Sequence, residues 1–201
     1  LDVRLGRGVR LVRAALALDT GELRVWVRHQ GRLRSLLVVL RRDAPVLGIA
    51  LPRGLPRPEV HPVPAWEYVR AQLEPAGFTA PEPFSGDDGL AGWTQMRPAD
   101  PTLAIGWRHR GSVLLVGSGC GQNARRARTG LERLLAGTAA AGWRALRERT
   151  RHWWQAYWAD VPAVDLPNPR LRFLYEFGMY KFAGLTPPEG VAATLQGAWV
   201  E

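Results

Sequence analysis

The segment ELRVWVRH, from Glu22 to His29, alternates apolar side chains with polar or aromatic ones. Leu23, Val25 and Val27 therefore fall on one face of an extended strand, which is the pattern of a strand with one buried face. Glycine-containing turn signals precede and follow the segment, at Asp19-Thr20-Gly21 and Gln30-Gly31. A strand between two short turns predicts an antiparallel meander in this part of the chain.

The same pattern of short strands and turns extends on both sides of this segment. Further strands are predicted at Val9–Leu18, Arg32–Leu40, Val46–Leu51, Gly92–Arg97, Thr102–His109 and Ser112–Gly117. Prolines are frequent from residue 52 to residue 89, so irregular structure is expected there, with one short helix at Trp66–Leu73. We expect residues 1–121 to form an antiparallel β-sandwich-like domain.

After Gly121 the hydrophobic period becomes helical. Asn123 is a predicted N-cap, and the helical pattern runs to about Trp158, with Gly137 predicted to divide it or to mark a bend. Residues 122–160 are therefore expected to be a helical linker. Asn168-Pro169 then opens a new amphipathic helix, because Asn is a good cap and Pro suits the first helical position. The prolines after residue 186 end this helix.

The formal charge of +9 raises the question of a nucleic-acid partner, but the distribution of the charge argues against one. The basic residues are arginines apart from Lys181, and they are scattered along the chain. In the densest cluster, at Arg125, Arg126 and Arg128, a solvated helix face is favoured over a phosphate site. No run of about 18 apolar residues predicts a membrane span. We expect neither nucleic acid nor membrane as a partner.

Few residues suggest metal or cofactor chemistry. Cys120 is the only cysteine, the four histidines are scattered, and no metal-ligand spacing is found, so no metal and no cofactor are expected. The glycines of Gly117-Ser118-Gly119-Cys120-Gly121 predict a loop, and they lack the full spacing of a dinucleotide-binding turn. Candidate acid and base pairs, namely Asp160 with Asp165 and Glu189 with Glu201, do not have a convincing spacing.

The last fifty residues carry four motifs in a characteristic order. The motifs are HWWQAYW from His152, VDLPNP from Val164, LYEFGMY from Leu174 and LQGAW from Leu195. Together they resemble the start of the (α/α)6 barrel of family-95 glycoside hydrolases, the α-L-fucosidase and α-L-galactosidase group of six-hairpin glycosidases. That family is built from a β-sandwich, a helical linker and the barrel, which is the order predicted here.

The resemblance implies a fold, an activity and a small set of site residues. The fold is an α+β multidomain fragment in which residues 161–201 begin the catalytic barrel. The activity is inverting hydrolysis of oligosaccharides or polysaccharides. Gln196, Trp199 and Glu201 would line the sugar pocket, with bracing of the first barrel turn as the alternative reading of the first two. The family's proline and two asparagines are replaced here, by Ala192, Thr194 and Val200, so fucose specificity does not carry over.

The family's catalytic acid and base lie in segments beyond residue 201, so this piece alone is expected to be inactive. The chain begins at Leu1 in mid-pattern, and we expect the N-terminus to be truncated and the compartment to be undetermined. The helix around Tyr175 is expected to pack against further helices of the parent chain. Two other functions stay open: a non-catalytic carbohydrate-binding module, suggested by nine tryptophans, and a basic nucleic-acid binder, suggested only by the charge.

Overall fold

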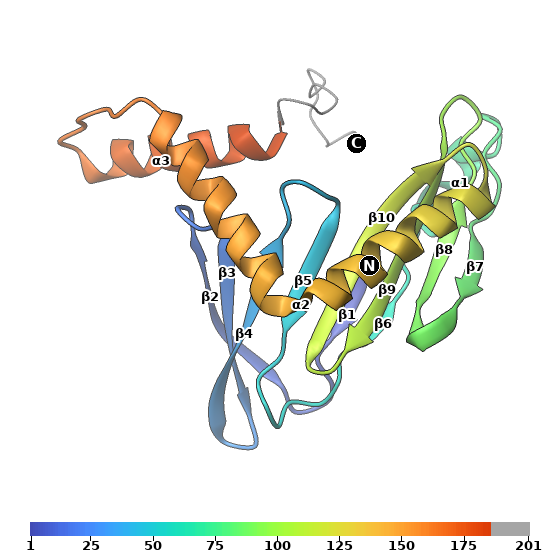
Figure 1. Ribbon diagram of the computed structural model, residues 1–201, viewed down its shortest axis with the longest axis horizontal. Coiled ribbons are helices and arrows are strands. Elements are labelled where there is room, and N and C mark those ends of the chain that lie inside the picture. Colours follow the sequence, from blue (N-terminus) through green and yellow to red (C-terminus); the bar gives the residue numbers. More distant parts are fainter. Residues whose placement is uncertain (186–201) are drawn as a thin grey trace.

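The structure, a computed structural model, describes residues 1–185 and contains one large antiparallel sheet (Figure 1). Its strands, in spatial order, are β2 (Arg10–Ala17), β3 (Glu22–His29), β4 (Arg32–Leu40), β5 (Val46–Ala50), β10 (Val113–Gly121), β9 (Thr102–Arg110), β8 (Ala91–Gln95) and β7 (Glu82–Ser85). A separate ribbon pairs β1 (Asp2–Arg4) with β6 (Glu59–His61). The helices are α1 (Trp66–Leu73), the 3-10 turn η1 (Asp87–Gly89), α2 (Ala124–Asp160) and α3 (Pro169–Leu185).

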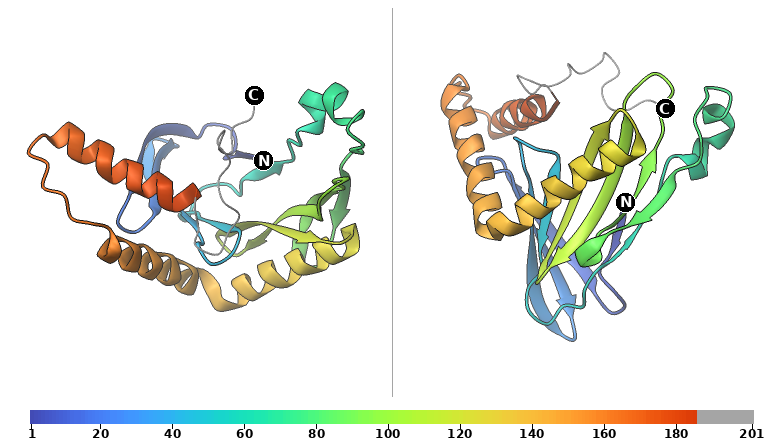
Figure 2. Two further views of the ribbon diagram at one scale, coloured as in Figure 1. Left: turned by 90° about the horizontal axis from the view of Figure 1, so that it is seen from above. Right: turned by 45° about the vertical axis from the view of Figure 1, so that its right-hand side comes forward.

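The predicted order of a β-rich region followed by helices is confirmed. The bounds of β3, β4 and α1 agree with the sequence patterns residue for residue. The two halves of the sheet are meanders, and they join where β5 pairs with β10, placing Leu115 opposite Gly48. The β-rich region is one eight-stranded sheet with helix α2 on one face and the β1–β6 ribbon on the other side, in place of two large packed sheets (Figure 2).

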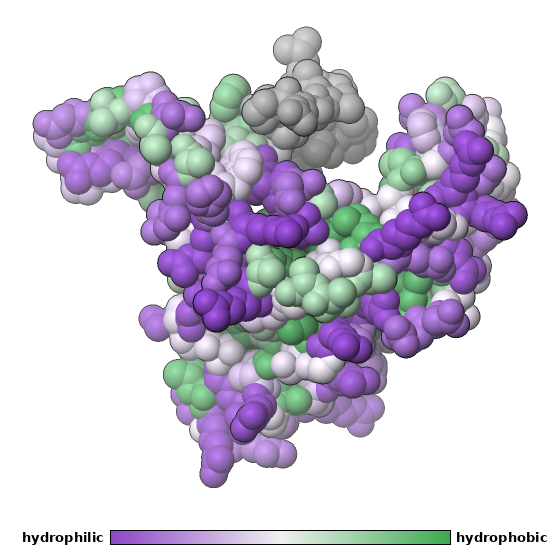
Figure 3. Space-filling model, viewed as in Figure 1, coloured by the Kyte–Doolittle hydropathy of each residue, from purple (hydrophilic) through white to green (hydrophobic). Residues whose placement is uncertain are grey.

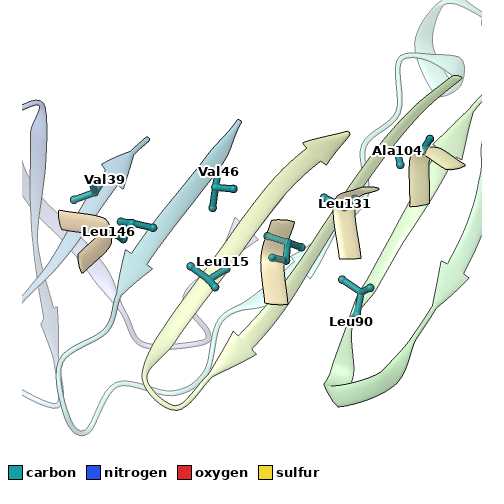
Figure 4. Packing of buried hydrophobic residues seen from close by; sticks show 9 residues of the cluster. Val39, Val46, Leu90, Ala104, Leu115, Leu131 and Leu146 are labelled. Atoms are coloured by element: carbon teal, nitrogen blue, oxygen red, sulfur yellow. The ribbon is translucent and has the colours of Figure 1, made fainter. Parts of the chain in front are cut away.

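Two hydrophobic cores hold these layers together. The first lies between α2 and the sheet, where Leu131 and Leu135 of α2 are fully buried against residues of β4, β5, β9 and β10 (Figure 4). The second lies on the opposite face, around Val27, Leu36 and Leu114, and the ribbon residue Val60 packs against it. The first part of α2 is therefore an integral layer of the β-rich unit.

A row of glycines across three strands lets α2 approach the sheet closely. Gly117 of β10 is paired with Gly106 of β9, which is in turn paired with Gly92 of β8. A Cβ atom at Gly117 would lie 3.0–3.1 Å from methyl carbons of Leu135 and Leu131, and one at Gly121 would lie 2.4 Å from the backbone nitrogen of Ala127. The glycines leave the space that the helix fills.

The pairing of β10 with β9 corrects the prediction of a loop at residues 117–121. These residues form the second half of β10, and their alternate glycines face α2. Cys120, between them, is exposed. The dinucleotide-loop reading is excluded by the same pairing, because the glycines sit in a strand ladder with β9.

Helix α2 begins and bends at defined residues. The Asn123 side chain accepts a hydrogen bond from the Arg126 backbone at 2.9 Å, which confirms the predicted N-cap. The bend lies at Gly142, with φ +83° and ψ 167°, and the prediction of Gly137 was wrong. Gly137 keeps helical geometry. We call the residues before Gly142 the first arm of α2 and those after it the second arm.

Helix α3 begins at the predicted cap and exposes many apolar side chains. Asn168 Oδ1 accepts a hydrogen bond from the Arg170 backbone at 2.9 Å. Ala183 is the one buried residue of the helix. Met179 and Tyr180 are half-buried. The exposed large apolar residues of α3 are Leu171, Phe173, Leu174, Phe182 and Leu185.

Candidate functional site

The predicted sugar-pocket residues Gln196, Trp199 and Glu201 lie outside the described residues, and their roles stay predictions. Glu189 lies outside as well. Asp160 and Asp165 are both exposed at the end of α2 and in the segment after it. Within residues 1–185, no group of three or more His, Cys, Asp or Glu side chains could hold a metal ion.

An aromatic junction fills the space between the second arm of α2, the β2–β3 turn and α3. We use this name for Trp153, Trp154, Tyr157, Trp158 and Tyr180. Trp154 is 3% exposed and stacks on Tyr180 with ring centroids 4.4 Å apart. Trp153 stacks on Tyr157 at 5.6 Å. Such pairs contribute packing energy beyond their buried area.

Polar contacts fix the position of the junction. The indole nitrogen of Trp158 donates to the carbonyl of Leu18 at 2.7 Å, and the Tyr157 hydroxyl donates to the carbonyl of Met179 at 2.8 Å. Gly21, with φ +63°, lies so close to the Trp154 ring that a side chain there would overlap it. The junction therefore ties α3 to the edge of the sheet.

Arg42 supplies a cation to the same junction. Its guanidinium lies over the Trp153 ring, 4.5 Å from the centroid, and donates to the carbonyl of Ala183. Burial lowers the pKa of Arg42, and burial raises the pKa of Tyr180, which nearby Arg42 partly offsets. Trp153, Trp154 and Trp158 therefore contact protein groups.

The arginine cluster at the start of α2 also faces protein groups. Arg128 pairs with Glu132 at 2.8 Å, donates to the carbonyl of Ser85 at 2.7 Å and lies over the Phe84 ring. Arg126 donates to the Gln122 side chain. A groove of about 420 Å³ runs beside these residues and contains both acidic and basic side chains. Its mixed charge does not favour a phosphate.

Sequence reasoning missed a second cavity, of about 320 Å³, on the inner side of the bend in α2. Its arginines come from both arms of the helix and from the β4–β5 connection. The lining residues are Arg41, Arg133, Leu134, Gly137, Thr138, Ala141, Ala145, Leu146 and Arg149. No local sequence motif predicts this cavity, because its lining residues come together only through the bend of α2 at Gly142.

None of the helices within residues 1–185 combines the length and the apolar character that crossing a bilayer requires.

Comparisons with known proteins do not assign a function to this geometry. The sequence matches no known protein family and no curated protein.

Proposed function

We propose that the chain is part of an inverting glycoside hydrolase that acts on oligosaccharides or polysaccharides. In this proposal the sheet and α2 support an (α/α)6 barrel of which α3 is the first helix. The sugar is bound by the segment after α3, through Gln196, Trp199 and Glu201. The motif order of the last fifty residues supports the proposal.

The exposed apolar surface of α3 is the observation that carries the proposal. Leu171, Phe173 and Leu174 are each more than half exposed. A helix gains most of its stability from packing an apolar face, and contiguous exposed apolar patches mark surfaces that bind another element. The first helix of a barrel presents such a surface to its neighbours.

The anchoring of α3 supports a positioning role for the β-rich unit. Tyr175 donates a hydrogen bond to the carbonyl of Pro162 at 2.7 Å, which fixes the turn between α2 and α3. The aromatic junction fixes the other end of α3 through Tyr180. A barrel built onto this helix would hold a constant orientation relative to the sheet.

Hydrolysis with inversion needs an acid that protonates the leaving oxygen and a base that activates water on the opposite face. The resemblance places both beyond residue 201. We therefore expect the 201-residue chain to give no turnover of aryl glycosides. A chain extended by the coding sequence that follows codon 201 should hydrolyse a glycoside.

The anomeric form of the first product, followed by proton NMR, tests the mechanism. Inversion supports the proposal, and retention contradicts it. A stop codon directly after codon 201, or turnover by the 201-residue chain itself, would also overturn it.

The second candidate is a non-catalytic carbohydrate-binding module, favoured by the nine tryptophans. Arginines lie over several indole rings, with Arg13 over Trp26 at 4.1 Å and Arg70 over Trp66 at 5.7 Å. Sugar stacking needs an open ring face, so these contacts weigh against this function. Quenching of tryptophan fluorescence by a soluble glycan would favour it, and no response to a broad glycan panel would argue against it.

A further inference from the structure

The inner side of the bend in α2 forms a cavity with a basic rim. Arg133 comes from the first arm and Arg149 from the second, while Arg41 enters from the β4–β5 connection, directly after β4. Leu134 and Leu146 supply an apolar wall. Figure 3 shows hydrophilic residues on both sides of this bend with hydrophobic residues between them.

Arg41 is held in one orientation. Its Nε and one terminal nitrogen donate to the two carboxylate oxygens of Asp43, at 2.8 and 2.5 Å. The other terminal nitrogen donates to Thr138 Oγ1 at 3.2 Å, and Thr138 donates its own proton to the carbonyl of Leu134. The Arg41 side chain is 12% exposed. A guanidinium has five N–H donors, so Arg41 keeps two that none of these bonds uses.

Arg133 and Arg149 differ from other arginines of α2. Arg128 and Arg144 each pair with a glutamate four residues later. The equivalent positions after Arg133 and Arg149 hold glycine and tryptophan, and in the described part of the chain neither arginine forms an ion pair. Among the described residues, no carboxylate lines the cavity. Asp43 pairs with Arg41, and the charge of Arg149 also helps to lower the pKa of Asp43. Three arginines line the cavity beside this one carboxylate, so the rim keeps a net positive charge.

We infer that the bend of α2 binds an oxyanion, that is, a carboxylate, sulfate or phosphate group, either free or carried on a sugar. Arginine forks match the geometry of such groups, and hydrogen bonds to charged groups are the strong ones. The volume of about 320 Å³ admits a sugar ring beside the anionic group, with Leu134 and Leu146 against its C–H face. This inference does not depend on the proposed hydrolase.

Isothermal titration calorimetry of the 201-residue chain tests the inference. The probes are sodium sulfate, sodium phosphate and sodium glucuronate, with glucose as the uncharged control. We expect at least one oxyanion to bind, glucose not to bind, and sodium chloride to weaken binding. Glucuronate binding tighter than both inorganic ions identifies a sugar acid as the ligand class, and the reverse order identifies a free oxyanion.

Charge-neutral variants locate the site. Arg133→Gln with Arg149→Gln should weaken binding by at least about tenfold, because two charge-assisted contacts are lost. The matched control, Arg10→Gln with Arg144→Gln, removes the same charge from exposed positions outside the cavity. It should leave binding within about twofold of the parent chain.

Three results would overturn the inference: no oxyanion binds at millimolar concentration, glucose binds as well as glucuronate, or the two double variants bind equally. All four substituted arginines are exposed, so the variants should keep the fold. Circular dichroism and thermal unfolding verify this before each titration.

Discussion

Arg147 of α2 donates two hydrogen bonds to Glu22 of β3, at 2.5 and 3.0 Å, across 125 residues of sequence. The Glu22 side chain is 11% exposed, and Arg151 lies 3.7 Å from one of its oxygens. The hydrogen bond to Glu22 also raises the pKa of Arg147. This pair fastens the second arm of α2 to the half of the sheet that the first arm does not cover.

Replacing Arg147 tests this fastening. Arg147→Ala leaves the nearly buried Glu22 carboxylate with only the longer contact to Arg151, so the free energy of unfolding should fall by about 1–3 kcal/mol. Urea denaturation measures the change. The control Arg144→Ala removes a solvent-exposed pair with Glu148 and should change the free energy of unfolding much less than Arg147→Ala does. Equal losses in the two variants would contradict the structural role of Glu22.

A side chain at the glycines of β10 that face α2 should push the helix away from the sheet. At Gly121 a Cβ would meet the backbone of Ala127, which cannot move without moving the helix, and we expect Gly121→Ala to destabilise by about 2–4 kcal/mol. At Gly117 a Cβ would lie nearest to the methyl groups of Leu135 and Leu131 and would meet the Pro45 carbonyl oxygen only at 3.4 Å, so Gly117→Ala should cost less. Gly130→Ala, on the open face of α2, should stabilise by up to about 1 kcal/mol. Thermal unfolding of the three variants should give this order, and a harmless Gly121→Ala would refute the close approach.

The bend of α2 should depend on glycine at one position. Gly142 has a backbone conformation that other residues avoid, and Gly142→Ala should destabilise by about 1–3 kcal/mol. Gly137→Ala lies in helical geometry with open space around it, and it should stabilise by up to about 1 kcal/mol. Chemical denaturation should show a lower free energy of unfolding for Gly142→Ala and a higher one for Gly137→Ala. A change in the same direction for both variants would contradict a bend at Gly142.

His109 of β9 should make stability depend on pH. Burial and the nearby charge of Arg57 lower its pKa below the ordinary value of 6.5. At pH values between the pKa of His109 in the folded chain and 6.5, the unfolded chain binds more protons than the folded chain. The free energy of unfolding should therefore decrease as the pH falls through this window. Denaturation measured at about pH 8 and about pH 5.5 gives the loss of unfolding free energy between the two pH values. This loss should be smaller in His109→Gln than in the parent chain. Arg57→Gln should reduce the loss in part, and an unchanged loss in both variants would exclude this cause.

Local patterns predicted most of the secondary structure. The alternation in Glu22–His29 gave the bounds of β3, and Asn123 and Asn168 gave the starts of α2 and α3, because these signals depend on a few neighbouring residues. The prediction of a loop at Gly117–Gly121 was wrong because the structure there does not depend on neighbouring residues. Glycine is a poor strand residue by itself, and only contact with a distant helix explains why it stands there.

Features that depend on distant contacts could not be predicted. Gly137 and Gly142 look alike in the sequence, and the bend falls where α2 must turn toward Glu22. The cavity at the bend combines Arg41 with residues about a hundred positions later, so no spacing reveals it. The predicted pocket residues Gln196, Trp199 and Glu201 rest on the resemblance alone.

The packing of α2 over strands that precede it in the chain affects how the protein is synthesised. Every strand leaves the ribosome before α2 does, so the face of the sheet that Leu131 and Leu135 cover is in water until those residues have been synthesised. A nascent chain that stalls near Asn123 presents bare apolar strands, the kind of surface through which incomplete chains aggregate. Translation speed and chaperone access over this short window should therefore govern the yield of soluble protein.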